Sequence, residues 1–352
     1  MSRGQLDYEC VICTRNRPEA LRLSIPLLLA QTRPPRRVIV ADASDDHAEI
    51  ARVVAELSAD AACEVVVLNP PRGSSVQRNE GLKLVESEVV FFPDDDSLYD
   101  PDYAEHVMRI YDRDTDHLIG GVTGTHRARM RDGEGEGAPA PQMALGPKLR
   151  QLISPARGRL ERKLVLDPLI SISWEARGRW TVPDWLAEVG GTPNCWVRGC
   201  RMSFRTEVIR AAEGFDEHLR NYATFEDVHL GFSIGRTKII AQAMQAMVFH
   251  MQFPGGRGSG RVRGATNIAN RAYVVACHSQ PGSVHRRRVV TYGMYRCLLY
   301  GAGGLWSAYH RQSFRGAIAV LRRLRPILLA PPEHAGEAYQ RLLARAGIPA
   351  DG

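Results

Sequence analysis

The sequence lacks an uncharged apolar run long enough to cross a bilayer. The nearest candidate, residues 289–306, is interrupted by Arg296 and is rich in glycine. The first seven residues also lack the apolar core of a secretory signal. Cysteine occurs seven times, an odd number, at irregular spacing, which does not indicate a disulfide framework. We therefore expect a cytoplasmic protein with reduced thiols and no membrane-spanning helix.

Lysine is also scarce, and aromatic residues do not alternate with basic ones. Only Lys83, Lys148, Lys163 and Lys238 accompany the arginines. Such a bias often reflects codon composition, so it has little functional weight. Proteins that bind nucleic acids interleave aromatic residues with a basic face, and no such pattern is evident here. We therefore expect no nucleic-acid partner, and the net charge of +7 suits an anionic ligand or an anionic membrane surface.

The first hundred residues alternate short apolar strands with amphipathic helices. We predict strands at 8–13, 37–42, 64–68 and 89–92, separated by helices at 20–31, 47–57 and 76–84. Alternation with such short connections predicts an α/β fold with a doubly wound, mostly parallel sheet. Ligands of these sheets bind beyond the carboxyl ends of the strands. Thr14, Asp42 and the run Asp94-Asp95-Asp96 all fall at such ends.

The three consecutive aspartates predict a cation site. Clustered carboxylates repel each other and need a cation or strong hydrogen-bond donors. A divalent ion would satisfy them and would also bridge the two phosphates of a nucleotide diphosphate. The alternative is an acidic turn that caps a helix.

A second acidic pair, Glu226-Asp227, opens an apolar helix. The pair either caps that helix, where the dipole favours carboxylates, or supplies a general base that deprotonates an acceptor hydroxyl. His250 ends a predicted strand at 246–249 and is either structural or the ligand that completes a carboxylate metal site. In the glycine-rich loop that follows, Arg257 and Arg261 suit the charge of phosphates.

Two more residues have both a structural and a functional interpretation. Arg78, with Asn79 beside it, either lies on a solvated helix face or contacts the nucleotide or its diphosphate. Trp196 is either part of the core or a stacking platform for the apolar face of a sugar ring.

Several short motifs, in this order, resemble glycosyltransferase family 2, which has the GT-A fold. They are Thr14-Arg15-Asn16-Arg17-Pro18-Glu19, Asp42-Ala43-Ser44, Gln77-Arg78-Asn79-Glu80-Gly81, Asp94-Asp95-Asp96, Glu213-Gly214-Phe215-Asp216-Glu217 and Glu226-Asp227. Order and rough spacing agree over residues 8 to about 255. Glu213 departs from the pattern, because the family usually has glycine there.

The resemblance implies a role for each matching residue. Thr14, Arg15, Asp42 and Arg78 would bind the donor nucleotide, and Asp94 and Asp95 its diphosphate. Asp96 and Asp94, completed by His250, would hold Mn²⁺ or Mg²⁺. Asp227 would be the base, with Glu226 orienting it or replacing it.

The resemblance also implies an activity and a division of the chain. The expected enzyme moves a sugar from a nucleotide-diphospho-sugar to an acceptor hydroxyl, with inversion. The expected parts are a nucleotide-sugar-binding half at 1–124, an insertion or mobile loop at 125–165, an acceptor-binding half at 166–255, and a loop with C-terminal helices at 256–352. The rival enzyme class is a nucleotidyltransferase, but its glycine-rich loop is absent after the first strand.

The C-terminal helices, over residues 286–346, combine many arginines with leucine, isoleucine and valine. Helices of this composition can lie in a membrane interface with arginine toward anionic lipid. In that case the protein would be peripheral on the inner face of the membrane, and a lipid-linked acceptor would suit it. The alternatives are that the helices cover the catalytic domain or form a homodimer contact.

Overall fold

The computed structural model describes residues 5–128, 167–176, 179–219, 224–253 and 259–349. These residues form two compact units. The sheet unit contains the described residues up to 128, together with 179–219 and 226–253. The helical unit contains 167–176, 224–225 and 259–349. Most of the predicted insertion at 125–165, and Arg257, lie outside the described residues.

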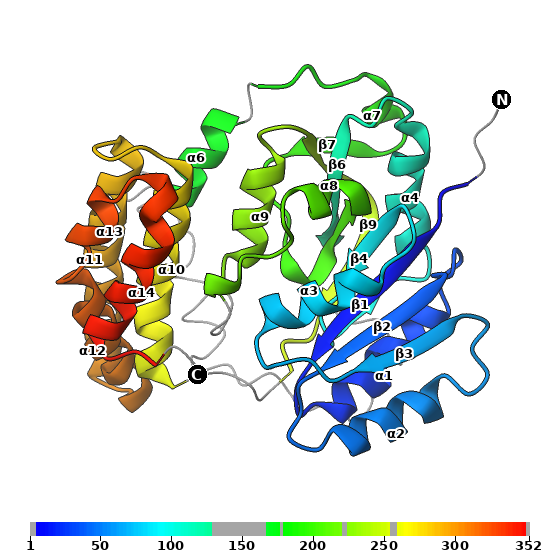
Figure 1. Cartoon of the computed structure of the whole chain (residues 1–352), viewed down its shortest axis with the longest axis horizontal. Helices are drawn as coiled ribbons and strands as arrows, with labels where there is room; N and C mark the ends of the chain where they lie inside the picture. The colour runs from blue at the N-terminus through cyan, green and yellow to red at the C-terminus, as the bar shows by residue number, and fades with distance from the viewer. Residues whose placement is uncertain (1–4, 129–166, 177–178, 220–223, 254–258, 350–352) are drawn as a thin grey trace. The chain divides into compact units, whose positions relative to one another are not determined.

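The first part of the sheet unit alternates strands and helices as predicted (Figure 1). Its elements are β1 (Tyr8–Thr14), α1 (Pro18–Leu29), β2 (Arg37–Asp42), α2 (His47–Leu57), β3 (Glu64–Leu68), α3 (Ser74–Leu84) and β4 (Val89–Phe92). The bounds of β2, α2, β3 and β4 equal the predicted ones. Helix α1 begins earlier because Pro18 fits the first turn, where its missing N–H is not needed.

The rest of the sheet unit completes the sheet with shorter elements. These are β5 (Ser97–Tyr99), α4 (Tyr103–Arg113), β6 (Ile119–His126), α7 (Trp185–Glu188), β7 (Gly191–Asn194), η1 (Gly199–Arg201), β8 (Met202–Arg205), α8 (Thr206–Ala211), η2 (Glu217–Leu219), α9 (Glu226–Ile234) and β9 (Ile239–His250). The acidic pair Glu226-Asp227 thus opens α9, and His250 ends β9, as predicted.

The strand order is β3-β2-β1-β4-β8-β6-β9-β5, with β7 also pairing β9. The run β3-β2-β1-β4 is parallel throughout. Strand β8 runs antiparallel to both β4 and β6, whereas β6 and β9 are parallel. The predicted α/β fold with a parallel arrangement of the first strands is therefore confirmed, with antiparallel pairs added in the second half of the sheet.

Apolar side chains cover both faces of this sheet. Along β1, Tyr8, Cys10 and Ile12 belong to one core cluster, and Val11 belongs to another. Helices α1, α2 and α4 pack on the first face, and α3, α8 and α9 on the second. Burial on both faces explains why the parallel strands appear in the sequence as short continuous apolar runs.

The helical unit consists of α6 (Pro168–Ala176), α10 (Gly260–His278), α11 (Val284–Gly304), α12 (Ala308–Leu321), α13 (Arg325–Leu329), η3 (Pro332–His334) and α14 (Ala335–Ala346). The predicted C-terminal helical extension is therefore confirmed. Gly264 and Gly316 let α10 and α12 approach closely, since a Cβ at either would lie 2.0 Å or less from the backbone of the other helix. Among the described helices, none is both long and apolar enough to cross a membrane.

Polar groups also tie this unit together internally. Asn270 donates to the Thr224 carbonyl at 3.2 Å and accepts from the Tyr339 hydroxyl at 2.8 Å. The guanidinium of Arg271 lies between the rings of Phe225 and Tyr292, at 4.2 and 4.3 Å from their centroids. These contacts fix residues 224–225 against α10 and α11.

Candidate active site

The turn after β4 holds the three aspartates at the end of the parallel sheet. Asp94 forms a parallel bridge with Cys13, at the end of β1. The hydroxyl of Ser97 accepts from the Asp94 N–H at 3.1 Å and donates to the Cys200 carbonyl at 3.1 Å. The turn is therefore fixed from both sides, and its carboxylates are held in defined directions.

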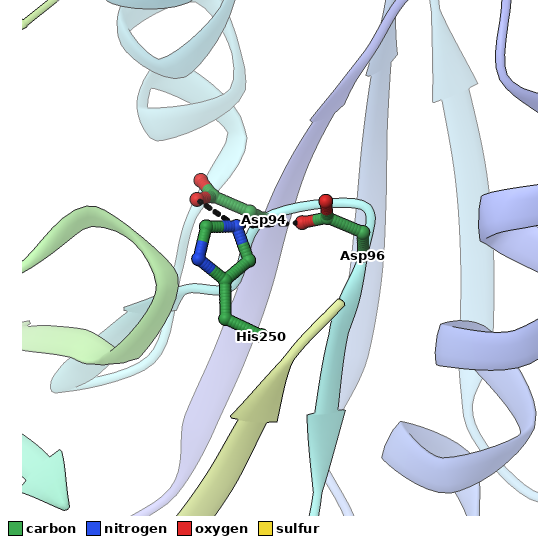
Figure 2. A group of neighbouring side chains, drawn as sticks. All are labelled: Asp94, Asp96 and His250. Atoms are coloured by element: carbon green, nitrogen blue, oxygen red, sulfur yellow. Dashed lines mark ion pairs between the residues drawn. The ribbon is translucent and has the colours of Figure 1, made fainter. Parts of the chain in front are cut away.

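Two of the three aspartates converge with His250, as the sequence predicted (Figure 2). His250 Nε2 lies 3.0 Å from Asp96 Oδ1 and 3.8 Å from Asp94 Oδ2. One ligand atom from each residue lies within 4.8 Å of the others, close to the spread that a single cation needs at ~2.0–2.2 Å from each ligand. Two carboxylates and an imidazole can therefore hold a divalent transition metal ion.

The imidazole of His250 and the carboxylates of Asp94 and Asp96 stabilise each other's charged forms. Burial alone would lower the pKa of His250, but its hydrogen bond to Asp96 and the charges of Asp96 and Asp94 raise it. Burial favours the neutral form of Asp96, yet that hydrogen bond, the His250 charge and the Phe253 N–H lower its pKa. The Phe253 N–H donates to Asp96 Oδ2 at 2.8 Å. A positive charge therefore stabilises these carboxylates, and a cation can take the place of the imidazole proton.

Asp95 does not join this cluster. It accepts from the Thr14 hydroxyl at 2.9 Å and from Arg17 at 3.1 Å. Burial and the charge of Asp96 raise the pKa of Asp95 to about 7. The contacts of Asp95 with Thr14 and Arg17 join the turn to the end of β1 and to the start of α1. Arg17 lies within the motif at residues 14–19, but no local pattern in the sequence distinguishes it from its neighbours.

Arg78 connects the aspartate turn to the second acidic pair. Its Nη2 donates to Asp94 Oδ1 at 2.9 Å, and its Nη1 donates to Glu226 Oε1 at 2.7 Å. Arg78 and Glu226 are both buried, with side chains 5% and 7% exposed. Burial alone would lower the pKa of Arg78, but the charges of Glu226 and Asp94 raise it. The solvated-face interpretation of Arg78 is therefore wrong, because this guanidinium bridges two parts of the site.

Asp227 has different surroundings from its neighbour Glu226. It accepts from the Gly199 N–H at 2.9 Å and from the Val228 N–H at 2.8 Å, but it has no ion pair among the described residues. Burial and the charge of Glu226 raise the pKa of Asp227 to about 7. Because Glu226 is held by Arg78, Asp227 is the member of the pair that is available to exchange a proton near neutral pH.

The ends of β1 and β2 lie side by side, as predicted. The Gln77 side chain donates to the carbonyls of Thr14 and Ala41, at 2.9 and 2.7 Å. Asp42 is buried, accepts from the Ser44 N–H at 2.9 Å and pairs with His47 Nδ1 at 2.7 Å. These bonds order the loop that follows β2.

Arg15 and Trp196 lie at less buried positions. The guanidinium of Arg15 pairs with Asp45 at 3.4 Å. Trp196 is half-buried, and the guanidinium of Arg198 lies 5.6 Å from its ring centroid. One face of the indole is therefore already covered by a cation.

The turn at Gly214-Phe215 is attached to α3 by Asn79. The Asn79 side chain accepts from the Phe215 N–H and donates to the Phe215 carbonyl, both at 2.8 Å. Glu213 and Gly214 have φ of 61° and 75°, in the left-handed region. That region favours glycine, which accounts for the glycine that is usual at this position in the family pattern. Glu213 adopts the same backbone conformation with a larger side chain.

Residues 9–156 match the family model described as Glycosyl transferase family 2. No curated protein sequence matches the chain significantly. Among solved structures, Staphylococcus aureus TarS 1–349 in complex with UDP-GlcNAc is 14% identical, with a TM-score of 0.51, covering 97% of this chain and 93% of that one. A mannosyltransferase from Pyrobaculum calidifontis, in complex with GDP-Man and Mn²⁺, is 15% identical, with a TM-score of 0.49, covering 98% and 87%.

The fold and the family match define the class of protein as a glycosyltransferase with the GT-A fold. More narrowly, residues 9–156 form a glycosyl transferase family 2 domain. The resemblance drawn from the motifs is thereby confirmed. Of the two enzyme classes weighed from the sequence, the match supports glycosyl transfer and not nucleotidyl transfer.

Proposed function

We propose that the chain is a metal-dependent, inverting glycosyltransferase that moves a sugar from a nucleotide-diphospho-sugar to an acceptor hydroxyl. One observation carries this proposal. Arg78 contacts both Asp94 and Glu226, so the candidate metal site and the acidic pair belong to one site. A cation held by Asp94, Asp96 and His250 would stabilise the charge of the departing nucleoside diphosphate.

The residues of the chain perform the remaining tasks of a single displacement. The acceptor oxygen attacks the anomeric carbon while the bond from that carbon to the diphosphate breaks. Asp227 receives the acceptor proton, which its raised pKa of about 7 allows near neutral pH. Thr14, Arg15 and Asp42 are proposed to lie at the nucleotide, and Trp196 at the acceptor. The diphosphate is proposed to lie at Asp94 and the buried Arg78.

A donor panel tests the proposal. The full chain is incubated with UDP-, GDP- and dTDP-sugars, UDP-GlcNAc among them, with Mn²⁺ or Mg²⁺ and no acceptor. We expect slow hydrolysis of one donor, loss of that activity after chelation, and its return with added metal. Hydrolysis that survives chelation would contradict the metal dependence. Failure to bind or cleave any donor would contradict the proposed activity.

We further propose that the helical unit binds an anionic membrane surface. Val284, Met294 and Leu298 lie along one side of α11, where Arg287 is also exposed, and Leu305 directly follows the helix; all four apolar residues are exposed. Trp306, next to Leu305, is 83% exposed. A helix with such a face can lie in a membrane interface without spanning the bilayer.

The charge of the helical unit supports a membrane partner over a second copy of the chain. Residues 259–349 contain fourteen arginines, no lysine and only two acidic residues, Glu333 and Glu337. Two such units would repel each other, whereas anionic lipid attracts each of them. Arg286 is an exception to the predicted lipid-facing arginines, because it is buried and donates to the Ala276 and Leu328 carbonyls at 2.8 and 3.0 Å.

Vesicle flotation tests the membrane proposal. The full chain is expected to float with anionic vesicles at low salt and to be released at high salt, because screening weakens the attraction. The double change Leu305→Gln and Trp306→Gln should reduce flotation strongly. Leu84→Gln, at an exposed leucine of α3, is the control and should float like the wild type. Equal flotation of the double variant, or salt-dependent self-association without lipid, would contradict the proposal.

A further inference from the structure

Two arginines flank Gly199, which is fixed inside the candidate active site. The N–H of Gly199 donates to Asp227 Oδ2 at 2.9 Å. A Cβ placed on Gly199 would lie 3.7 Å from the carboxylate oxygens of Asp94. Arg198 precedes Gly199, and Arg201 ends the same 3₁₀ turn, η1. Both arginines therefore lie on a segment that borders the site at the candidate base.

Among the described residues, Arg198 and Arg201 lack the carboxylate partner that several other arginines of the sheet unit have. Arg201 Nε is buried, and no described residue accepts a hydrogen bond from it. Within the described ranges, no carboxylate pairs with Arg198 or Arg201. Four others nearby in the fold are each paired, namely Arg17 with Asp95, Arg78 with Asp94, Arg127 with Asp100 and Arg205 with Asp114. Arg198 is exposed and can be solvated by water, whereas Arg201 is partly buried. A partly buried guanidinium without a counter-ion is unfavourable unless a ligand supplies the anion.

Positive charge also accumulates around this pair. Burial lowers the pKa of His126, and the charges of Arg201, His250, Arg127 and Arg198 lower it further. Burial likewise lowers the pKa of Arg201, and the charge of Arg198 acts in the same direction, whereas the charge of Asp227 acts in the opposite direction without reversing the shift. Like charges gathered at the end of β6 and beside η1 repel one another. An anion placed among them would relieve that repulsion.

We propose that Arg198 and Arg201 bind a phosphate group carried by the acceptor. Guanidinium groups match phosphate oxygens in charge and in their fork of donors. Gly199, between the two arginines, lies beside Asp94 at the proposed diphosphate site as well as beside Asp227, the proposed base. We assign the phosphate to the acceptor because the N–H of Gly199 donates directly to Asp227, and the second titration below tests that choice. Trp196, against which Arg198 packs, offers an apolar face for the sugar or polyol that bears the phosphate. This inference rests on the proposed function and narrows its acceptor to a phosphorylated sugar or polyol.

Calorimetric titration of the full chain with glycerol 3-phosphate tests the inference without requiring turnover. Glycerol, which lacks the phosphate, is titrated in parallel. We expect saturable binding of glycerol 3-phosphate only, and affinity reduced about tenfold in Arg201→Gln and in Arg198→Gln, the loss expected for a charged hydrogen bond. Arg52→Gln, at an exposed arginine of α2, is the matched control and should bind like the wild type.

A second titration, with the nucleoside diphosphate found in the donor panel, separates the two sources of phosphate. The inference predicts that this affinity stays near the wild-type value in both variants. If the variants lose affinity for the nucleoside diphosphate and keep it for glycerol 3-phosphate, the arginines serve the donor and the inference is wrong. Unchanged binding of glycerol 3-phosphate in both variants, or no binding by the wild type, would also overturn it. If no nucleotide sugar is bound or cleaved in the donor panel, the proposed function fails, but the glycerol 3-phosphate titration still tests whether Arg198 and Arg201 bind a phosphate.

Discussion

Replacement of Asp96 by alanine is expected to lower sugar transfer by at least about 10³-fold, because the diphosphate loses the cation that stabilises its developing charge. Asp96 has two roles at once. One of its oxygens faces His250 at 3.0 Å, and the other accepts from the Phe253 N–H at 2.8 Å. The alanine variant therefore loses a metal ligand and a support for the residues after β9.

Two further variants separate these roles. Asp96→Asn keeps an oxygen for the Phe253 N–H but removes the negative charge, so it should lose Mn²⁺ affinity while retaining thermal stability. Asp95→Asn changes the same kind of side chain in the same turn, but Asp95 faces Thr14 and Arg17. Its Mn²⁺ affinity should stay near the wild-type value. Electron paramagnetic resonance of free Mn²⁺ measures the Mn²⁺ affinity of both asparagine variants. Normal sugar transfer by Asp96→Ala without added metal would show that the cation site is misassigned.

The parallel half of the sheet could be predicted from the sequence because its signals are local. Each strand is a short apolar run, and a helix of amphipathic spacing follows it. The bounds of β2, β3 and β4 follow from where the apolar run stops. The ends of such strands meet at one edge, so the convergence of Thr14, Asp42 and the aspartate turn could be predicted without coordinates.

The composition of the cation cluster depends on contacts that no local pattern encodes. Composition and periodicity do not distinguish the three consecutive aspartates, and only the family resemblance assigned Asp94 and Asp96 to the metal. In the folded turn, Asp95 lies toward Thr14 and the other two lie toward His250. His250 reaches them because β5 pairs antiparallel with β9, which sets Ser97 opposite His250. That pairing joins distant parts of the chain, and β5 is too short to show a periodic pattern.

Arg286 is a residue whose position could not be predicted from the sequence. One of the interpretations of the C-terminal helices places their arginines toward lipid, and Arg286, beside Arg287 and Arg288, does not fit it. It is instead buried and donates to carbonyls near the ends of α10 and α13. Helix ends leave carbonyls unsatisfied, and a guanidinium with five donors can satisfy several of them. A run of identical arginines carries no information about which member has that role.

Replacement of Asp227 by asparagine is expected to lower turnover by on the order of 10²-fold or more, with donor affinity little changed, because it removes a proton acceptor and keeps the shape. The pH dependence gives a second readout. As the proposed base, Asp227 would act in its deprotonated form, so turnover of the wild type should rise as pH increases through about 7 and level off above it. This acidic limb should be absent from the asparagine variant.

Glu226→Gln is the informative comparison, because it alters the neighbouring carboxylate of the same pair. Glu226 is 2.7 Å from Arg78, so its replacement removes one of the two ion pairs of a buried guanidinium. We expect weakened stability and donor affinity, while the acidic limb near pH 7 remains, since Asp227 is still present. If Glu226→Gln instead loses turnover and the acidic limb together, while Asp227→Asn keeps both, then Glu226 is the base and Asp227 serves to hold Gly199 in place.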